Sequence, residues 1–220
     1  YRAMINKIKE LAKRFHKDTV DIRRYLHEFP GLSFEEYNAI QVIHNFLTSW
    51  NIEHEPMTPT GIVAVIRGRN PEKKTIALRA DTDALPIQEK NKCPYKSSVP
   101  GVMHACGHDA HTAMLLGVAR ILNLLKDEFE GTIKLIFQPG EEKLPGGASL
   151  MIKHGVLKGV DAIIAQHVYP DLPCGEVRFH AGEYMASCDE INITVSGKGG
   201  HAAKIKERSN TTVAAAKILC

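Results

Sequence analysis

The run Thr132-Ile133-Lys134-Leu135-Ile136-Phe137 decides the fold class of this 220-residue chain. Its β-branched and aromatic residues follow the turn Glu130-Gly131, so we expect a buried strand. Before it, His108–Leu125 has the length and apolar periodicity of a helix, and beyond it a predicted helix over Gly147–His154 leads into the strand-like run Ala162–Ala165. Helix alternating with strand predicts a three-layer α/β/α domain with a mixed sheet.

The part of the chain before this region predicts two helices and two strands. Apolar residues recur at helical spacing from Ile5 to Leu47, with a break at Phe29-Pro30-Gly31, and Ser33 is placed to cap the second helix. The short apolar runs Gly61–Ile66 and Thr75–Leu78 are separated by a turn-like stretch, and we predict a pair of strands there.

A second domain is expected to begin after Gly182. Glu190–Val195 alternates polar and apolar residues as a half-exposed antiparallel strand does, and a helix is predicted from about Asn210 to Cys220. We therefore expect a first domain over residues 1–182 and the start of an incomplete α+β domain over residues 183–220.

The composition is that of an ordinary soluble globular protein, with 44% hydrophobic and 24% charged residues. The formal charge of +3 is small and the basic residues are scattered, which argues against nucleic acid and for a small-molecule partner. No apolar run approaches the roughly 18 residues of a membrane span. The N-terminus, Tyr1 to Lys17, is charged and amphipathic and does not look like a signal peptide, so we expect a cytoplasmic protein. Five cysteines without paired spacing argue for reduced thiols.

The segment Met103–His111 holds a thiol, three imidazoles and a carboxylate at the predicted start of a helix. Cys106 and His108 can face one cation if Gly107 relaxes the backbone between them, and this pair of ligands suits Zn, Mn or Co. Asp109 and His111 would then support the ligands or cap the helix. The alternative is a histidine-rich helix turn with a buried free cysteine.

Two further motifs follow predicted strands. Glu141 and Glu142 come where the Thr132–Phe137 strand ends, the edge of an α/β sheet at which ligands bind. Neighbouring side chains there point in different directions, so we assign Glu142 as a metal ligand and Glu141 as the general base. His167, at the end of the Ala162–Ala165 run, is a third candidate ligand. The alternatives are a solvated acidic loop and a hydrogen-bonded core histidine.

Asp81 and His201 are candidates for supporting roles. Asp81 could accept a hydrogen bond from a metal-binding histidine, or it could pair with Arg79, as could Asp83. The glycine-rich turn Gly197–Ala203 fits no phosphate-binding pattern, so its His201 is predicted to polarise a carbonyl.

On these motifs the chain resembles the aminoacylase/carboxypeptidase G family of metallohydrolases, and most closely its branch of hippurate hydrolases, N-acetylamino-acid deacetylases and auxin-conjugate hydrolases. The resemblance covers nearly the whole chain. Its motifs occur in family order and are Arg24–Pro30, Arg79–Pro86, Met103–His111, Gln138–Glu142 and Gly197–Ala203.

The resemblance implies an amidohydrolase that removes the acyl group from N-acyl amino acids with two divalent metal ions. It implies that Glu141 activates a water between the metals and that His201 comes from a lid domain that also forms a homodimer. The implied ligands are Cys106, His108, Glu142 and His167. The alternatives are a dipeptidase or carboxypeptidase of the same family, an inactive metal-binding protein, and a hydrolase with Cys106 as nucleophile.

The sequence departs from the family pattern in two places. Relatives place a fifth ligand, a histidine, in a C-terminal segment after the lid, and residues 1–220 contain no such segment, so we expect a truncated first domain with four of the five ligands. The stretch Lys204–Asn210 stands where relatives have a proline-containing segment, which bears on the placing of His201.

Overall fold

The structure is a computed structural model that describes residues 2–184, 191–201, 203 and 209–219. It divides into two compact units, Tyr1–Asp171 and Leu172–Cys220. The division falls at Asp171, whereas the domain boundary that we predict from the sequence falls after Gly182. Cys188 and Cys220 lie outside the described residues, and Cys93, Cys106 and Cys174 are free thiols.

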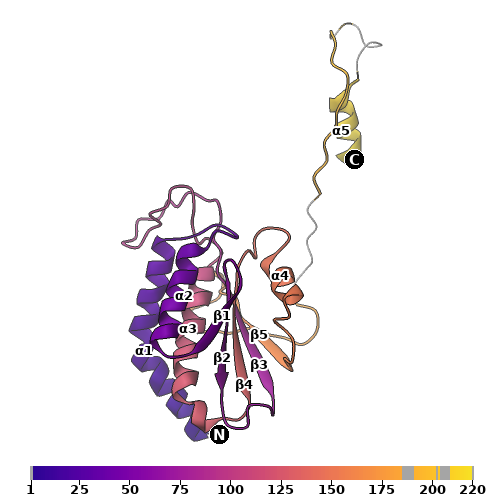
Figure 1. Ribbon diagram of the computed structural model, residues 1–220. Coiled ribbons are helices and arrows are strands. Elements are labelled where there is room, and N and C mark those ends of the chain that lie inside the picture. The colour runs from indigo at the N-terminus through magenta and orange to yellow at the C-terminus, as the bar shows by residue number, and fades with distance from the viewer. Residues whose placement is uncertain (1, 185–190, 202, 204–208, 220) are drawn as a thin grey trace. The chain divides into compact units, whose positions relative to one another are not determined.

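The first unit begins with two helices and three strands, after which helices and strands alternate (Figure 1). The helices are α1 (Arg2–Glu28), α2 (Tyr37–Ser49), α3 (His108–Leu124), a 3-10 turn (Lys126–Glu128) and α4 (Gly147–Lys153), and α5 (Thr211–Leu219) lies in the second unit. The strands are β1 (Glu53–Thr58), β2 (Gly61–Arg67), β3 (Thr75–Asp81), β4 (Thr132–Gln138) and β5 (Ala162–Ala165). The predicted helices and strands of the first unit are thereby confirmed, and so is the helix near the end of the chain.

The five strands form one mixed sheet in the order β1-β2-β4-β3-β5. β3 runs parallel to both β4 and β5, whereas β2 runs antiparallel to β1 and to β4. β2 and β3 are strands as predicted, but they do not pair with each other because β4 lies between them. A helical crossover through α3 returns the chain to the sheet and inserts β4 at that position.

β1 was not predicted from the sequence. Its residues, Glu53–Thr58, are mostly polar and include Pro56, a composition that does not look like a strand. It forms at the edge of the sheet, where one side of the strand needs no hydrogen-bond partner and proline is tolerated.

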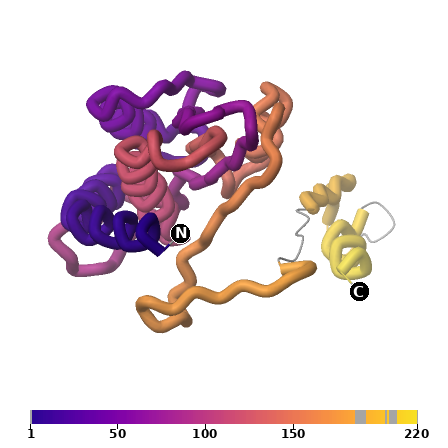
Figure 2. Tube along the Cα trace, turned by 90° about the horizontal axis from the view of Figure 1, so that it is seen from below, coloured from indigo at the N-terminus to yellow at the C-terminus, as the bar shows by residue number. Residues whose placement is uncertain are grey.

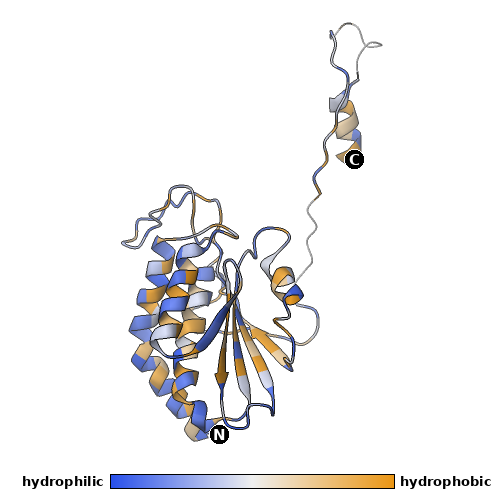
Figure 3. Ribbon diagram, viewed as in Figure 1, coloured by the Kyte–Doolittle hydropathy of each residue, from blue (hydrophilic) through white to orange (hydrophobic). Residues whose placement is uncertain are grey.

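The sheet is covered on both faces, which confirms the three-layer arrangement. Leu135 and Phe137 of β4 are buried in a core that includes residues of α1, α2 and α3, and the three helices lie side by side on that face (Figures 1 and 2). Ile136, between them in the sequence, points to the other face and packs with Met151 of α4. This alternation follows from the two-residue repeat of a strand and places apolar residues along both faces (Figure 3).

Two local predictions are wrong. Ser33 does not cap α2, whose N-cap is Glu36 without a side-chain cap bond; the Ser33 hydroxyl donates to Asp83 instead. The predicted strand over Glu190–Val195 is not formed at Ile191–Val195, while Glu190 lies outside the described residues. An alternating segment needs a partner strand, and the described residues of Leu172–Cys220 include no strand.

Among the residues that the structure describes, no helix is both long and apolar enough to cross a membrane.

Candidate metal centre

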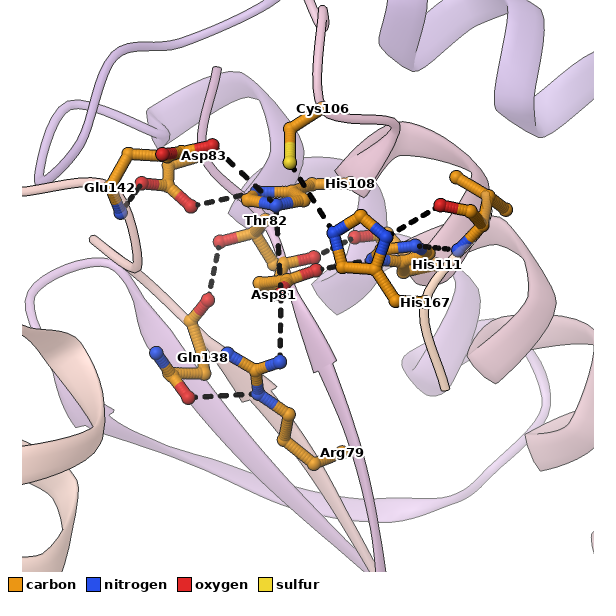
Figure 4. Close-up of polar contacts among 12 residues, drawn as sticks. Arg79, Asp81, Thr82, Asp83, Cys106, His108, His111, Gln138, Glu142 and His167 are labelled. Carbon is orange, nitrogen blue, oxygen red and sulfur yellow. Dashed lines mark hydrogen bonds and ion pairs between the residues drawn. The ribbon is translucent and has the colours of Figure 1, made fainter. Parts of the chain in front are cut away.

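The candidate centre lies where the parallel strands β3, β4 and β5 end and α3 begins (Figure 4). β3 ends at Asp81 and the loop after it carries Asp83, while the loops after β4 and β5 carry Glu141, Glu142 and His167. Open α/β sheets bind ligands at this edge because the loops after parallel strands converge there. Segments far apart in the sequence therefore bring their polar side chains to one place.

Three predicted ligands face one another. One donor atom from each of Cys106, His108 and His167 lies within 4.8 Å of the other two. The Cys106 sulfur is 3.3 Å from Nε2 of His167 and points toward that ring (Figure 4). Nδ1 of His167 lies 2.6 Å from the carbonyl oxygen of Val168, a geometry in which Nδ1–H donates and the Nε2 lone pair faces the sulfur.

Gly107 makes this arrangement possible. Its φ of 92° lies in the left-handed region that side chains rarely adopt. A Cβ at this position would lie 2.4 Å from Cγ2 of Val168, beside His167. Glycine is therefore required both for the turn into α3 and for the close approach of the His167 loop.

His108 supplies the observation that points most directly to a cation. Its side chain is fully buried, and its Nδ1 lies 3.1 Å from Oδ1 of Asp83. Its Nε2 is buried and has no hydrogen-bond partner among the residues that the structure describes. A buried ring nitrogen without a partner is costly, whereas metal-bound histidines commonly hold a carboxylate on the other nitrogen, so the donor set fits a divalent cation.

The two adjacent carboxylates lie on the same side of the centre. Glu141, Glu142 and His108 form a second group whose donor atoms lie within 4.8 Å, and Oε1 of Glu142 is 3.9 Å from Nε2 of His108. The backbone N–H of Glu142 donates to Asp83 at 2.9 Å. Partial burial and the charge of Glu142 raise the pKa of Glu141, which brings this carboxyl closer to the range of a general base at neutral pH.

Asp81 forms its hydrogen bond with His111, while its Oδ2 lies 3.6 Å from Nε2 of His108, too far for a hydrogen bond. From the sequence we expect Asp81 to orient a ligating histidine; in the structure it lies 2.6 Å from Nδ1 of His111 and 2.7 Å from Nη1 of Arg79. Nε2 of His111 accepts a hydrogen bond from the backbone of Val168. Both nitrogens of His111 are therefore occupied, and the carboxylate that orients His108 is Asp83.

Asp109 and His27 form a buried pair behind the centre. Their side chains are 2.7 Å apart, and Arg23 and Glu89 complete the group. Asp109 thus joins α1 to the start of α3, and its side chain faces α1. Sequence reasoning assigned no role to His27, although its place in the Arg24–Pro30 motif was the available signal.

The thiol of Cys106 lies among negative charges. Burial, a hydrogen bond to Glu142 and the charges of Glu142, Glu141 and Asp81 raise its pKa to about 12 in the absence of a cation. A cysteine nucleophile needs a lowered pKa, so this environment does not suit the alternative in which Cys106 attacks the substrate. A cation between the same groups would favour the thiolate.

His201 belongs to the second unit, Leu172–Cys220, where it is exposed and its Nδ1 accepts a hydrogen bond from the backbone of Ala203. Its predicted action on a substrate carbonyl stays a prediction.

Comparison with known proteins agrees with these features. Residues 77–219 match the family model described as Peptidase family M20/M25/M40. The chain is 46% identical over 206 residues to "N-acetylcysteine deacetylase" of Bacillus subtilis, covering 93% of this chain and 53% of that protein. It is 44% identical over 203 residues to "Thermostable carboxypeptidase 1" of Saccharolobus solfataricus, covering 91% of this chain and 51% of that protein.

A solved structure is also similar. It is a Bacillus subtilis protein described as a dinuclear metal binding peptidase from the M20 family, with 47% sequence identity and a TM-score of 0.71. The match covers 74% of this chain and 46% of that one. The chain spans about half the length of the curated relatives it matches.

The fold, the donor set and the similarity together define an α/β protein with a candidate metal centre at the end of its parallel strands. The chain belongs to Peptidase family M20/M25/M40.

Proposed function

We propose that this protein hydrolyses the amide bond of N-acyl amino acids with two divalent metal ions held at the end of the sheet. The observation that carries the proposal is the buried Nε2 of His108, which has no hydrogen-bond partner in the described part of the chain and lies beside Cys106, His167 and Glu142. The names of an N-acetylcysteine deacetylase and of a dinuclear metal binding peptidase among similar proteins support it.

The proposed ligands are Cys106, His108, Glu142 and His167. Thiolate and imidazole ligands suit Zn, Mn or Co better than Mg, so we propose one of these metals. When bound, divalent cations supply Lewis-acid polarisation of a carbonyl oxygen and activation of water. Asp83 holds the ring of His108 so that Nε2 faces the other ligands.

Glu141 is the proposed general base and acid. Its side chain is exposed at the centre and is not bound to a basic residue among the described ion pairs, so it is free to take a proton from water. The resulting hydroxide forms a bond to the carbonyl carbon of the amide, and Glu141 delivers the proton to the amine that leaves when the C–N bond breaks. His201 of the second unit is proposed to stabilise the negative charge that develops on the carbonyl oxygen.

The remaining parts of the proposal come from the sequence. We propose a homodimer formed through the second domain, a location in the cytoplasm, and an N-acyl amino acid as the partner in place of nucleic acid or a membrane.

The test combines metal analysis with a hydrolysis assay of the full chain. We expect two equivalents of divalent metal, release of amino acid from acetyl or benzoyl amino acids, and loss of activity with chelator. Glu141→Gln should lower turnover by about 100- to 10,000-fold while metal content is kept. Glu72→Gln, at an exposed site away from the centre, is the matched control. Full turnover in Glu141→Gln would overturn the role of Glu141, and absence of bound metal would overturn the proposed function.

A carboxypeptidase or dipeptidase activity is the second candidate, and the name of the Saccharolobus solfataricus relative favours it. The same residues would act, because both reactions break an amide bond with water. The ratio of kcat/KM for free dipeptides to that for N-acetyl amino acids separates the two. A ratio above one would replace the deacylase assignment with a peptidase.

A further inference from the structure

The connection between α1 and α2 contains side chains that no step above uses. We call residues 31–36 the connecting segment. Two of its polar side chains, Ser33 and Glu36, are buried although they lie on a loop. A buried polar side chain on a loop needs a partner, and the partners of these two are groups of the candidate centre.

Ser33 contacts the carboxylate that holds His108. Its hydroxyl donates to Oδ2 of Asp83 at 2.7 Å, and the same oxygen accepts the N–H of Glu142. The backbone N–H of Ala84 donates to the carbonyl of Gly31 at 2.8 Å. The segment is thus bonded to the loop after β3 through both side chain and backbone.

Glu36 contacts the loop after β4. Its Oε1 accepts the N–H of Gly140 at 2.7 Å, one residue before Glu141. Glu36 is fully buried, and no ion pair of the described residues includes it. Burial raises the pKa of Glu36, against opposing hydrogen bonds from Thr60 and the backbone. The bond geometry makes Oε1 of Glu36 the hydrogen-bond acceptor for the loop after β4.

Backbone geometry agrees with a close fit between the segment and the loop. Phe34 has a left-handed φ of 68°, which is uncommon for an aromatic residue. A Cβ on Gly140, whose φ is 52°, would lie 2.4 Å from the Phe34 ring. Strained backbone of this kind persists where surrounding contacts determine it, and here it accompanies the contact between segment and loop.

We propose that the connecting segment is a positioning element, in which Ser33 holds Asp83 and Glu36 holds the loop that carries Glu141 and Glu142. The proposal rests on the proposed function, since it concerns the same metal centre. Ser33 and Glu36 would touch neither metal nor substrate. They would set where the ligand Glu142 and the base Glu141 stand relative to His108.

The test begins with a readout that needs neither metal nor activity. Glu36→Leu keeps the side-chain size but removes the acceptor, so amide hydrogen exchange at Gly140 and Glu141 should become about tenfold faster in the metal-free protein. Glu36→Gln keeps the acceptor and should restore the parent rate. Glu35→Leu, at the exposed neighbouring position, is the matched control.

Metal affinity, measured by competition with a chelator, gives the second readout. Loss of an outer partner of a ligand commonly weakens metal binding 10- to 100-fold, so we expect about that loss in Glu36→Leu and a smaller loss in Ser33→Ala. Glu36→Gln should stay within about threefold of the parent, with kcat affected less than in Glu36→Leu.

Two outcomes would overturn the proposal. The first is unchanged exchange and metal affinity in both Glu36→Leu and Ser33→Ala. The second is a Glu36→Gln protein as impaired as Glu36→Leu, which would show that the charge and not the acceptor matters. If Glu36→Leu does not fold, Ser33→Ala and Glu36→Gln decide. If the parent binds no metal, the proposed function fails while hydrogen exchange still decides the role of the segment.

Discussion

The candidate centre has two sides that differ in how firmly the protein holds them. The buried wall consists of Asp81, Asp83, His108 and His111. The open wall consists of Cys106, Glu141, Glu142 and His167. Side chains of the buried wall form hydrogen bonds mainly with one another and with the backbone. Side chains of the open wall are exposed or half-buried, and Sγ of Cys106 lies 3.3 Å from Nε2 of His167. The difference indicates that the buried wall organises the site and that the open wall remains available for metal and substrate.

The largest expected effect comes from breaking the buried wall at Asp83. Its carboxylate is bonded to His108, Ser33 and the backbone of Glu142, so Asp83→Ala leaves three polar groups without their partner. We expect the free energy of unfolding of the metal-free protein to fall by about 3 kcal/mol. Urea denaturation in the presence of a chelator measures it.

The matched change on the open wall is Glu141→Ala. Because the Glu141 side chain is exposed, its removal should change the free energy of unfolding of the metal-free protein by less than about 0.5 kcal/mol. Equal losses in the two variants would remove the distinction between the walls.

The next effect is a pH dependence from Asp81. Burial alone would raise the pKa of this carboxyl, but the bond to His111 and the charges of Arg79 and His108 outweigh burial and lower it to about 2. A lowered folded-state pKa adds stability that is present above the unfolded value near 3.8 and is lost as the pH falls toward 2.

We therefore expect the free energy of unfolding of the metal-free parent to fall by about 2 kcal/mol more than that of Asp81→Asn between pH 5 and pH 2. Chemical denaturation across this range compares the two proteins. Identical acid-side profiles would show that Asp81 is not held as an ionised member of the buried wall.

The smallest expected effect concerns the reactivity of the open wall. With the pKa of the Cys106 thiol raised to about 12, little thiolate is present at pH 8 in metal-free protein. Iodoacetamide should therefore label exposed Cys174 before Cys106, as mass spectrometry of the peptides can show. Preferential labelling of Cys106 would favour the alternative in which Cys106 is a nucleophile. It would indicate that the pKa of the thiol is lowered by a positive group at the open wall.

Much of the fold could be predicted because its signals are local. The apolar runs of β4 and β5 and the periodicity of α3 appear within single segments of sequence. The separation of β2 from β3 could not be predicted, because β4, the strand that lies between them, comes more than fifty residues after β3 in the sequence. β1 could not be predicted because Pro56 and the polar residues around it are tolerated only in a strand at the edge of a sheet, and the sequence does not show where that edge lies.

The sequence was enough to predict which residues belong to the candidate site, but not which hydrogen bonds they form with one another. Residue type marks Cys106, His108, Glu142 and His167 as possible ligands, and three strand ends at one sheet edge predict their convergence. Which carboxylate bonds to which histidine depends on the backbone conformation at the end of β3 and just after it. Asp81 and Asp83 differ by two residues, and the sequence offers no means to assign His111 to the first and His108 to the second.

The sequence by itself determined the class of this protein: an α/β chain whose candidate metal ligands lie after its strands and at the start of a helix. It could do so because strand and helix periodicity and ligand chemistry are properties of neighbouring residues. Only the tertiary structure decided the order of the strands, the pairing of Asp83 with His108, and the contact of the connecting segment with the Glu141–Glu142 loop. Those features depend on distances between residues that are tens of positions apart, which are set when the layers pack.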